Sequence, residues 1–210
     1  MIRSTDGQFV ELISSPEAKG WRRSQVSCQL CGEYVPFPEF ANLMDKFPPV
    51  PPIRSYFGLT QSSRLPIADA DHHVSFDMVA GSWHHVYALS SIFKNRDSDP
   101  ECRAFRDAYE TQWLNYSEDA PLSSSRLYHN INAETLLITA DGFLILGKRH
   151  KSMIFGGAWS TSIEEQMIRC DPENPSKTDK HLFDAAERGV QEELDATVIK
   201  DETRLLKVGI

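Results

Sequence analysis

The stretch with the clearest structural signal is Phe183-Asp-Ala-Ala-Glu-Arg-Gly-Val-Gln-Glu-Glu-Leu-Asp195. Apolar residues recur in it at intervals of three and four, which predicts an amphipathic helix that buries one stripe: Phe183, Ala186, Val190 and Leu194. On another face Arg188 and Glu192 lie one helical turn apart, with Glu193 beside them. Adjacent carboxylates repel each other when both are ionised, so this face needs a basic group or a cation such as magnesium.

The same helix resembles the signature helix of the Nudix family, hydrolases of nucleoside-diphosphate derivatives, which reads Arg-Glu-apolar-any-Glu-Glu-any-Gly. Its counterpart here is Arg188-Gly-Val-Gln-Glu-Glu-Leu-Asp195, in which the matching residues are Arg188, Val190, Glu192 and Glu193. The resemblance implies that Glu192 and Glu193 are catalytic and hold a magnesium or manganese ion. It also implies that Arg188 orients one of these carboxylates through charge-assisted hydrogen bonds.

The chain also departs from the family signature. Gly189 replaces the first helical glutamate, and Asp195 replaces the closing glycine. Upstream, Asn174 and Lys180 stand where the family has a glycine and a glutamate. Gly189 removes a carboxylate from the metal shell, which weakens the site for a hard cation that binds oxygen ligands. Glu165, which lies where the family turns toward its metal site, is a candidate for the missing ligand.

Two short apolar runs precede the helix, at residues 134–139 and 143–146. The Asp141-Gly142 pair between them predicts a β-hairpin, because glycine tolerates the positive φ that a tight turn requires. After such a hairpin the family has a basic residue, an aromatic-glycine segment and a tryptophan, and the chain has the same order: Lys148, Arg149, Gly156-Gly157 and Trp159. The resemblance implies that Arg149 and Lys148 bind a substrate phosphate. The alternative is that Lys148 and Arg149 are ordinary basic residues at the end of a hairpin and bind no ligand.

The resemblance covers roughly residues 128 to 210 and implies an α/β (α+β) fold in which a mixed sheet packs on the signature helix. A polar break at residues 117–125 predicts the main domain boundary. Residues 1–125 would then form an accessory N-terminal region, and residues 126–210 a Nudix-like domain. A proline-rich run at residues 47–52 predicts an extended connector that divides the accessory region.

The Nudix-like domain is expected to be incomplete. Residues 197–199 and 205–210 read as strands, and the further strands and closing helix of the family do not follow them. A sheet cut in this way exposes an unpaired edge. The N-terminal region, a protein partner or a second copy in a homo-oligomer would have to complete the fold.

The composition of the chain limits the classes of partner that it is expected to bind. The chain has 210 residues, of which 40% are hydrophobic and 25% charged, and these are ordinary globular proportions. Its formal net charge of −8 argues against nucleic acid and anionic membranes as partners. No apolar run is long enough to cross a bilayer, and the N-terminus lacks the pattern of a secretory signal. A cytoplasmic location with reduced cysteines is therefore expected.

Cys28-Gln-Leu-Cys31 is a second motif that could carry chemistry. A pair of thiolates at this spacing can bind zinc, but a structural zinc site needs four ligands. Further ligands would have to come from elsewhere through folding, with these candidates: Cys102, Cys170, His72, His73, His84 and His85. The simpler alternative is that Cys28 and Cys31 are partly buried side chains without a metal.

Residues 99–116 are predicted to form a helix with an aromatic face, because apolar residues recur at helical spacing: Cys102, Phe105, Tyr109 and Trp113. This face packs either on the protein's own core or on a partner.

Two functions from different classes follow from the sequence. The first is a Nudix-like, magnesium- or manganese-dependent hydrolase of a nucleoside-diphosphate derivative, with Glu193, Glu192 and Arg188 as its catalytic residues. The second is a catalytically degenerate Nudix-like module that binds a nucleotide or a protein partner in a larger complex. A third hypothesis is an interaction domain that a zinc ion at Cys28 and Cys31 stabilises, in which case the Nudix resemblance is accidental.

Overall fold

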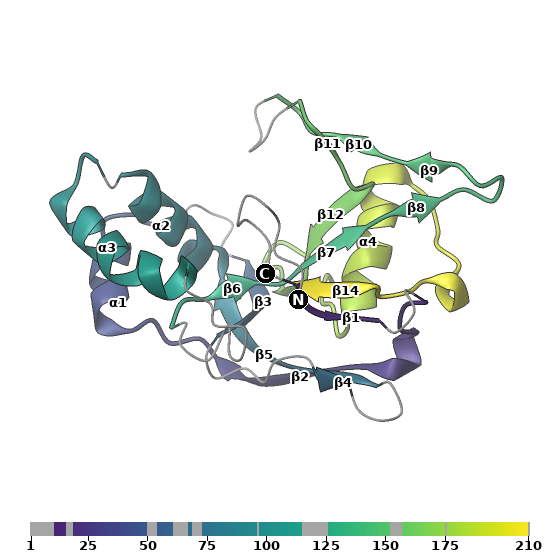
Figure 1. Cartoon of the computed structure of the whole chain (residues 1–210), viewed down its shortest axis with the longest axis horizontal. Coiled ribbons are helices and arrows are strands. Elements are labelled where there is room, and N and C mark those ends of the chain that lie inside the picture. The colour runs from purple at the N-terminus through teal and green to yellow at the C-terminus, as the bar shows by residue number, and fades with distance from the viewer. Residues whose placement is uncertain are drawn as a thin grey trace.

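The structure, a computed structural model, describes residues 11–15, 19–49, 54–60, 67–68, 73–95, 97–114, 126–151, 157–174 and 176–209. These residues form a mixed α/β protein, as the sequence predicts. A mixed sheet occupies the middle of the molecule, helices α1 (Pro38–Met44), α2 (Trp83–Lys94) and α3 (Pro100–Leu114) gather at one end, and α4 (Leu182–Leu194) lies at the other (Figure 1). None of the helices in the described residues could span a membrane.

The central sheet is built from segments that are far apart in the sequence. Its six strands are β2 (Val26–Glu33), β3 (Ser55–Leu59), β4 (Ile67–Ala68), β5 (Val74–Ser82), β6 (His129–Asn130) and β13 (Ile168–Cys170). β5 pairs with β2 in parallel and with β3 antiparallel. Because β6 and β13 both pair with β3, strands from either side of residue 125 share this sheet.

Helix α4 packs against a separate pair of strands, residues 132–135 and 163–166, and its buried side chains join those of the central sheet in the first hydrophobic core. The buried members of this core are Trp21, Val26, Phe57, Leu59, Val74, Phe76, Met78, Met167, Leu182, Phe183 and Ala185. The predicted helix is confirmed, and Phe183 and Val190 are buried as expected. The predicted stripe is wrong at Leu194, whose side chain is 43% exposed, and Ala186 is only half-buried, because the buried face includes Ala185 and Gly189 instead.

The ends of α4 are defined by local hydrogen bonds. His181 caps the first turn, where its Nδ1 accepts the N–H of Phe183 at 3.3 Å. Its Nε2 therefore carries the proton and donates to the carbonyl oxygen of Val26 at 2.7 Å, which ties the helix start to β2. The helix ends at Asp195, which adopts the left-handed conformation with φ of 49°.

A second hydrophobic core lies among α1, α2 and α3. Its buried members are Phe37, Phe40, Leu43, Met44, Ala88, Leu89, Ile92, Cys102, Phe105 and Leu127. The predicted helix at residues 99–116 is confirmed as α3, and Cys102 and Phe105 pack in this core, with Tyr109 against it. The side chain of Trp113 and residues 115–116 lie outside the described residues, as do residues 50–53, residues 117–125, His72 and Gly156.

The predicted hairpin at residues 134–146 is confirmed. Gly142 has φ of +87° in its turn, and β8 (Leu137–Ile138) pairs antiparallel with β9 (Leu144–Ile145). The chain continues into β10 (Gly147–Lys148), which pairs with β11 (Trp159–Ser160). β7 (Asn132–Thr135), just before the hairpin, pairs instead with β12 (Ile163–Gln166), which lies against α4. Figure 1 shows β8 to β11 at one edge of the molecule, beyond the sheet.

The N- and C-terminal ends of the described chain meet in one small sheet. β1 (Glu11–Ser14) pairs antiparallel with β14 (Lys207–Gly209), which confirms part of the strand predicted at residues 205–210. Trp21 forms a bridge with Leu205 beside this pair. The strand predicted at residues 197–199 is wrong, because that segment is irregular and leads into a 3-10 turn, η3 (Lys200–Glu202). A second 3-10 turn, η2 (Arg23–Gln25), precedes β2.

Candidate functional site

Arg188 lies at the centre of a buried ion-pair network between α4 and β12. Its Nε and Nη2 donate to the two carboxylate oxygens of Asp179 at 3.2 and 2.9 Å, and its Nη1 donates to Glu165 at 2.7 Å. Nη2 also donates to the carbonyl oxygen of Gln166 at 2.8 Å. Burial disfavours the guanidinium charge, but the hydrogen bonds to Asp179 and Glu165 outweigh it and raise the pKa of Arg188. Arg188 is therefore a fixed cation that joins the helix to the strand.

Asp179 is the buried anion of this network. Its side chain is 4% exposed, and besides accepting from Arg188 it accepts the backbone N–H of Ile168 at 2.7 Å. It therefore connects α4 with the start of β13. Both oxygens of this buried carboxylate therefore accept hydrogen bonds, from the Arg188 guanidinium and from a backbone N–H, and these bonds stabilise its charge.

Glu192 and Glu193, one turn further along α4, differ in their surroundings. Glu192 forms an ion pair with Lys177 at 2.6 Å and lies 3.7 Å from Arg188. Burial, followed by the negative charges of Glu165 and Glu192, raises the pKa of Glu193. The three carboxylates therefore share one region, and cations already neutralise two of them, those of Glu165 and Glu192.

A cavity of about 260 Å³ opens beside this network. It is lined by Arg54, Tyr56, Glu164, Glu165, Gln166, Ile168, Lys177, Arg188 and Glu192. Arg54 reaches it from the segment before β3, with its Nε 3.0 Å from an oxygen of buried Asp171. That Nε–H is buried and has no hydrogen-bond partner among the described residues, so the ion pair lacks a directed hydrogen bond. Three cationic and three acidic side chains thus line one small cavity.

Gly189 lies where α4 approaches β12 most closely. A Cβ atom built on it would lie 2.7 Å from Cγ2 of Ile163 and still closer to Cγ of Glu165. Real Cβ atoms essentially never approach a heavy atom so closely. The position that holds the first helical glutamate in the Nudix signature therefore has no room here for any side chain.

The residues do not fit the magnesium ion that the resemblance implies. Among the described residues, no group of three or more His, Cys, Asp or Glu side chains is placed to hold a metal ion. Glu165 is bound by Arg188 and Glu192 by Lys177, so their oxygens already serve as hydrogen-bond acceptors. A hard divalent cation needs several free oxygen ligands in a regular arrangement.

The structure keeps the two predicted phosphate-binding residues apart from this cavity. The ammonium group of Lys148 lies 5.5 Å from the centre of the Trp159 ring. Arg149 forms an ion pair with Glu164, which also accepts from the hydroxyl of Ser160. Only Glu164 of this group lines the cavity, so Arg149 acts on the site through Glu164.

Cys28 and Cys31 both lie on β2, where Cys28 is opposite Phe76 of β5 and Cys31 lies at the register shift between Leu30 and Gly32. Burial raises the pKa of the Cys28 thiol, although a backbone hydrogen bond from Leu182 opposes this. Cys31 is exposed, and its thiol lies 3.8 Å from the carbonyl oxygen of Gln29. A buried thiol with a raised pKa is a poor metal ligand, since zinc binds the thiolate.

Sequence reasoning missed Lys177 and Arg54, and it did not predict the ion pair of Asp179. Asp179 and Lys177 lie in the irregular segment before α4, and Arg54 comes from the opposite half of the chain. The only local signal was an acidic residue, Asp179, shortly before the signature helix. Arg54 gave no signal, because pairing of β13 with β3 alone brings it to the cavity.

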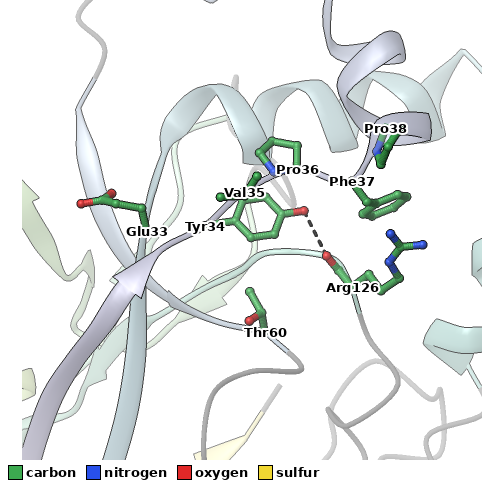
Figure 2. A pocket seen from close by; sticks show the side chains of 8 residues that line it. All are labelled: Glu33, Tyr34, Val35, Pro36, Phe37, Pro38, Thr60 and Arg126. Atoms are coloured by element: carbon green, nitrogen blue, oxygen red, sulfur yellow. Dashed lines mark hydrogen bonds between the residues drawn. The ribbon is translucent and has the colours of Figure 1, made fainter.

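A second, larger cavity of about 420 Å³ lies between the sheet and the helices (Figure 2). It is lined by Glu33, Tyr34, Val35, Pro36, Phe37, Pro38, Thr60 and Arg126. The Tyr34 hydroxyl donates to the carbonyl oxygen of Arg126 at 3.0 Å, and the guanidinium of Arg126 stacks 4.3 Å above the Phe37 ring. None of the residues predicted from sequence as site residues lines it.

Comparison of the chain with family models and with curated proteins found no match.

Proposed function

We propose that this chain is a Nudix-like module that binds the phosphate groups of a nucleotide-like ligand in the 260 Å³ cavity and does not hydrolyse them. The observation that carries the proposal is the contact between Lys177 and Glu192, at 2.6 Å. An ammonium group here takes the place that a divalent cation would need beside the signature carboxylate. Close packing of Gly189 against β12 supports the same conclusion, because it leaves no room for the first signature glutamate.

The Nudix-like part of the proposal rests on the signature helix and its surroundings. Arg188 binds a carboxylate on the neighbouring strand, and the helix packs against β12, which follows the hairpin and Trp159. This is the order of elements that the resemblance implies. The order and the helix support a Nudix-like arrangement, while the chemistry is argued from the cavity itself.

Cationic side chains around the cavity favour an anionic ligand. Arg188 is fixed by Asp179 and Glu165, and the Nε of Arg54 lies against buried Asp171, whereas Lys177 holds Glu192 at a half-exposed rim. The Lys177 ammonium and the Nη groups of Arg54 can turn to a phosphate, which accepts charge-assisted hydrogen bonds from both lysine and arginine. A volume of about 260 Å³ is below the usual range for a whole ligand, so it suits a diphosphate whose nucleoside lies outside.

Binding should be measured by titration calorimetry with ADP and with inorganic pyrophosphate, in EDTA. We expect Lys177→Gln to weaken binding by about tenfold, the loss of about 1.4 kcal/mol. Glu192→Gln should strengthen binding, since it frees the Lys177 ammonium from its carboxylate. Lys180→Gln is the matched control, because Lys180 is an exposed lysine near the same helix and does not line the cavity. Absence of binding, or equal binding by Lys177→Gln, would refute the proposal.

A metal-dependent hydrolase is the second candidate, favoured by the proximity of Glu165 and Glu192 to Glu193, whose pKa is raised first by burial and then by these two negative charges. It predicts that ADP or a larger nucleoside-diphosphate derivative is cleaved in the presence of magnesium or manganese. Cleavage would then be lost in Glu193→Gln and in Glu192→Gln. Cleavage by the wild-type chain in the presence of metal, lost in both variants, would therefore favour the hydrolase, and binding without cleavage would favour the binding module.

A further inference from the structure

The hairpin that includes β8, β9 and β10 carries an exposed apolar face. We call this face, together with the tryptophan that pairs beside it, the arm face. Its members and their exposed fractions are Leu136 (52%), Ile138 (72%), Leu144 (53%), Leu146 (47%) and Trp159 (68%). Isolated exposed hydrophobic residues are ordinary, but a contiguous set marks an interaction surface.

The strand register shows that these side chains share one side. Ile138 lies directly opposite Leu144, and residues directly opposite each other in an antiparallel pair point to the same side. Strict alternation of exposed and half-buried residues continues through 131–140 and 144–150, so Leu136 and Leu146 join them. Lys148 follows on the same side and is paired with Trp159. The arm face is therefore continuous.

The opposite side of this hairpin faces the body of the protein. Leu137 and Ile145 are half-buried there, and the Ser162 hydroxyl accepts from the Leu137 N–H and donates to the Ile145 carbonyl oxygen. A two-stranded hairpin is marginally stable in water unless a hydrophobic face packs on something. With one side only half-buried, covering the arm face would contribute substantially to its stability.

We propose that the arm face packs against the arm face of a second copy of this chain, related by a two-fold axis. An apolar face is complementary to itself, which is the requirement for a two-fold interface. Charges at its two ends make a second copy the best fit. Asp141 lies at the turn, and Lys148, which forms no ion pair among the described residues, lies at the other end.

Two arms packed antiparallel bring each turn to the base of the other arm. Asp141 of each copy then meets Lys148 of the other, so the interface has two identical pairs of opposite charge. Such complementarity at the rim fixes the orientation of an interface whose centre is apolar. This inference is independent of the ligand-binding proposal, because the arm face does not line the 260 Å³ cavity.

Light scattering coupled to size-exclusion chromatography tests the proposal on the full chain over a range of concentrations. We expect a species of twice the monomer mass of 23.8 kDa. The double variant Ile138→Ser, Leu144→Ser should raise the dissociation constant by at least about tenfold, since each 1.4 kcal/mol is a factor of ten. Ile199→Ser is the matched control, because Ile199 is 64% exposed and lies outside the arm face.

Reversing the charges at the two ends of the arm face distinguishes self-association from the binding of another partner, and it leaves the apolar residues unchanged. Lys148→Glu and Asp141→Lys should each weaken the dimer, and the two together should restore it, since the pair is reversed in both copies. Circular dichroism confirms that each variant folds. The proposal is overturned if the chain is monomeric at every concentration, if the serine variant dimerises with the same dissociation constant as the wild-type chain, or if the double reversal fails to restore association. Binding to a different protein or to lipid vesicles by a monomeric chain overturns it as well.

Discussion

A single glycine determines how closely the helix of the candidate site approaches its strand. Gly189 is buried between α4 and β12, and the nearest neighbouring atoms belong to Ile163 and Glu165. Glycine costs about 1 kcal/mol relative to alanine in a helix interior, so its presence needs a local reason. Close approach of β12 is that reason. The same approach lets Glu165 reach Arg188.

Gly189→Ala should therefore destabilise the protein, although alanine is the better helix former. The gain in helix propensity is about 1 kcal/mol, whereas overpacking a tight contact costs about 1–3 kcal/mol. We expect a net loss of about 1 kcal/mol in the free energy of unfolding, measured by urea denaturation. Gln191→Ala, on the exposed side of α4, is the control and should change that free energy by less than about 0.5 kcal/mol. A more stable Gly189→Ala variant would show that the contact is looser than described.

Asp179→Asn tests the buried ion pair. It leaves the Arg188 guanidinium without its bidentate anion in a buried site, and breaking such a pair costs about 3–5 kcal/mol. Thermal unfolding should show a clearly lower midpoint. Glu101→Gln removes a carboxylate from the exposed pair with Lys46 and should have almost no effect, since exposed pairs contribute about 0–1 kcal/mol. Equal effects of the two substitutions would contradict a structural role for Asp179.

The sequence predicted that Arg188, Glu192 and Glu193 lie together, because helical spacing alone brings them together. It did not predict the partners that determine what they do. Lys177 and Asp179 reach the network through an irregular segment, and such segments have no periodicity from which a direction can be derived. The sequence therefore suggested carboxylates around a metal ion, whereas in the structure the carboxylates of Glu165, Glu192 and Asp179 form ion pairs. These contacts are defined only by the tertiary structure.

Elements with strong local signals were predictable. The hairpin followed from an Asp-Gly turn between apolar runs, and α4 from its period. The buried stripe of α4 was partly wrong, because the face that a helix buries depends on where its sheet lies. Residues 197–199 have high β-propensity but pair with no strand among the residues that the structure describes, and they are irregular.

Three strand segments meet at Ser162, which joins the hairpin to β12. Its hydroxyl accepts the Leu137 N–H at 2.8 Å and donates to the carbonyl oxygen of Ile145 at 2.5 Å, in place of ladder hydrogen bonds. Ser162→Ala leaves both backbone groups without this partner at a buried position, which costs about 1–3 kcal/mol. Hydrogen exchange should accelerate at Leu137 and remain slow in α4.

Ser98→Ala serves as the control for this experiment, because the Ser98 hydroxyl is exposed and donates to the carbonyl oxygen of Asn95, in the turn between α2 and α3. Uniformly faster exchange in both the hairpin and α4 would mean that Ser162 supports the whole fold rather than the junction.

At the scale of the whole molecule, two separate hydrophobic cores stabilise the two ends of the protein. The first hydrophobic core contains residues from Trp21 to Ala185, so the N-terminal and C-terminal halves of the chain both contribute side chains to it. Sequence reasoning offered the N-terminal region as one way to complete the fold but did not predict which strands pair, since the parallel ladder of β2 with β5 and the pairing of β13 with β3 join distant segments. Long-range pairing of this kind leaves no periodic signal in a single sequence.

Buried histidines in both halves make the stability of the whole molecule depend on pH. Burial, with a smaller effect of His84, lowers the pKa of His85 from 6.5 to about 4, and burial lowers the pKa of His129 to about 4. Burial also lowers the pKa of His181, against the effect of its hydrogen bond to Val26. Between about pH 6.5 and pH 4 the unfolded chain binds protons that the folded protein does not, so stability rises with pH.

The free energy of unfolding should therefore be highest above about pH 7 and fall as the pH decreases toward 4, with each histidine adding at most about 1.4 kcal/mol per pH unit. Urea titrations at several pH values measure this slope. His85→Gln removes one titrating group, and its slope should be shallower by that amount than the slope of the wild-type chain. Gln191→Ala, which removes no titratable group, should leave the slope unchanged. A stability that is flat between pH 7 and pH 5 would contradict the burial of these rings, because a buried neutral histidine necessarily resists protonation more than the same residue in the unfolded chain.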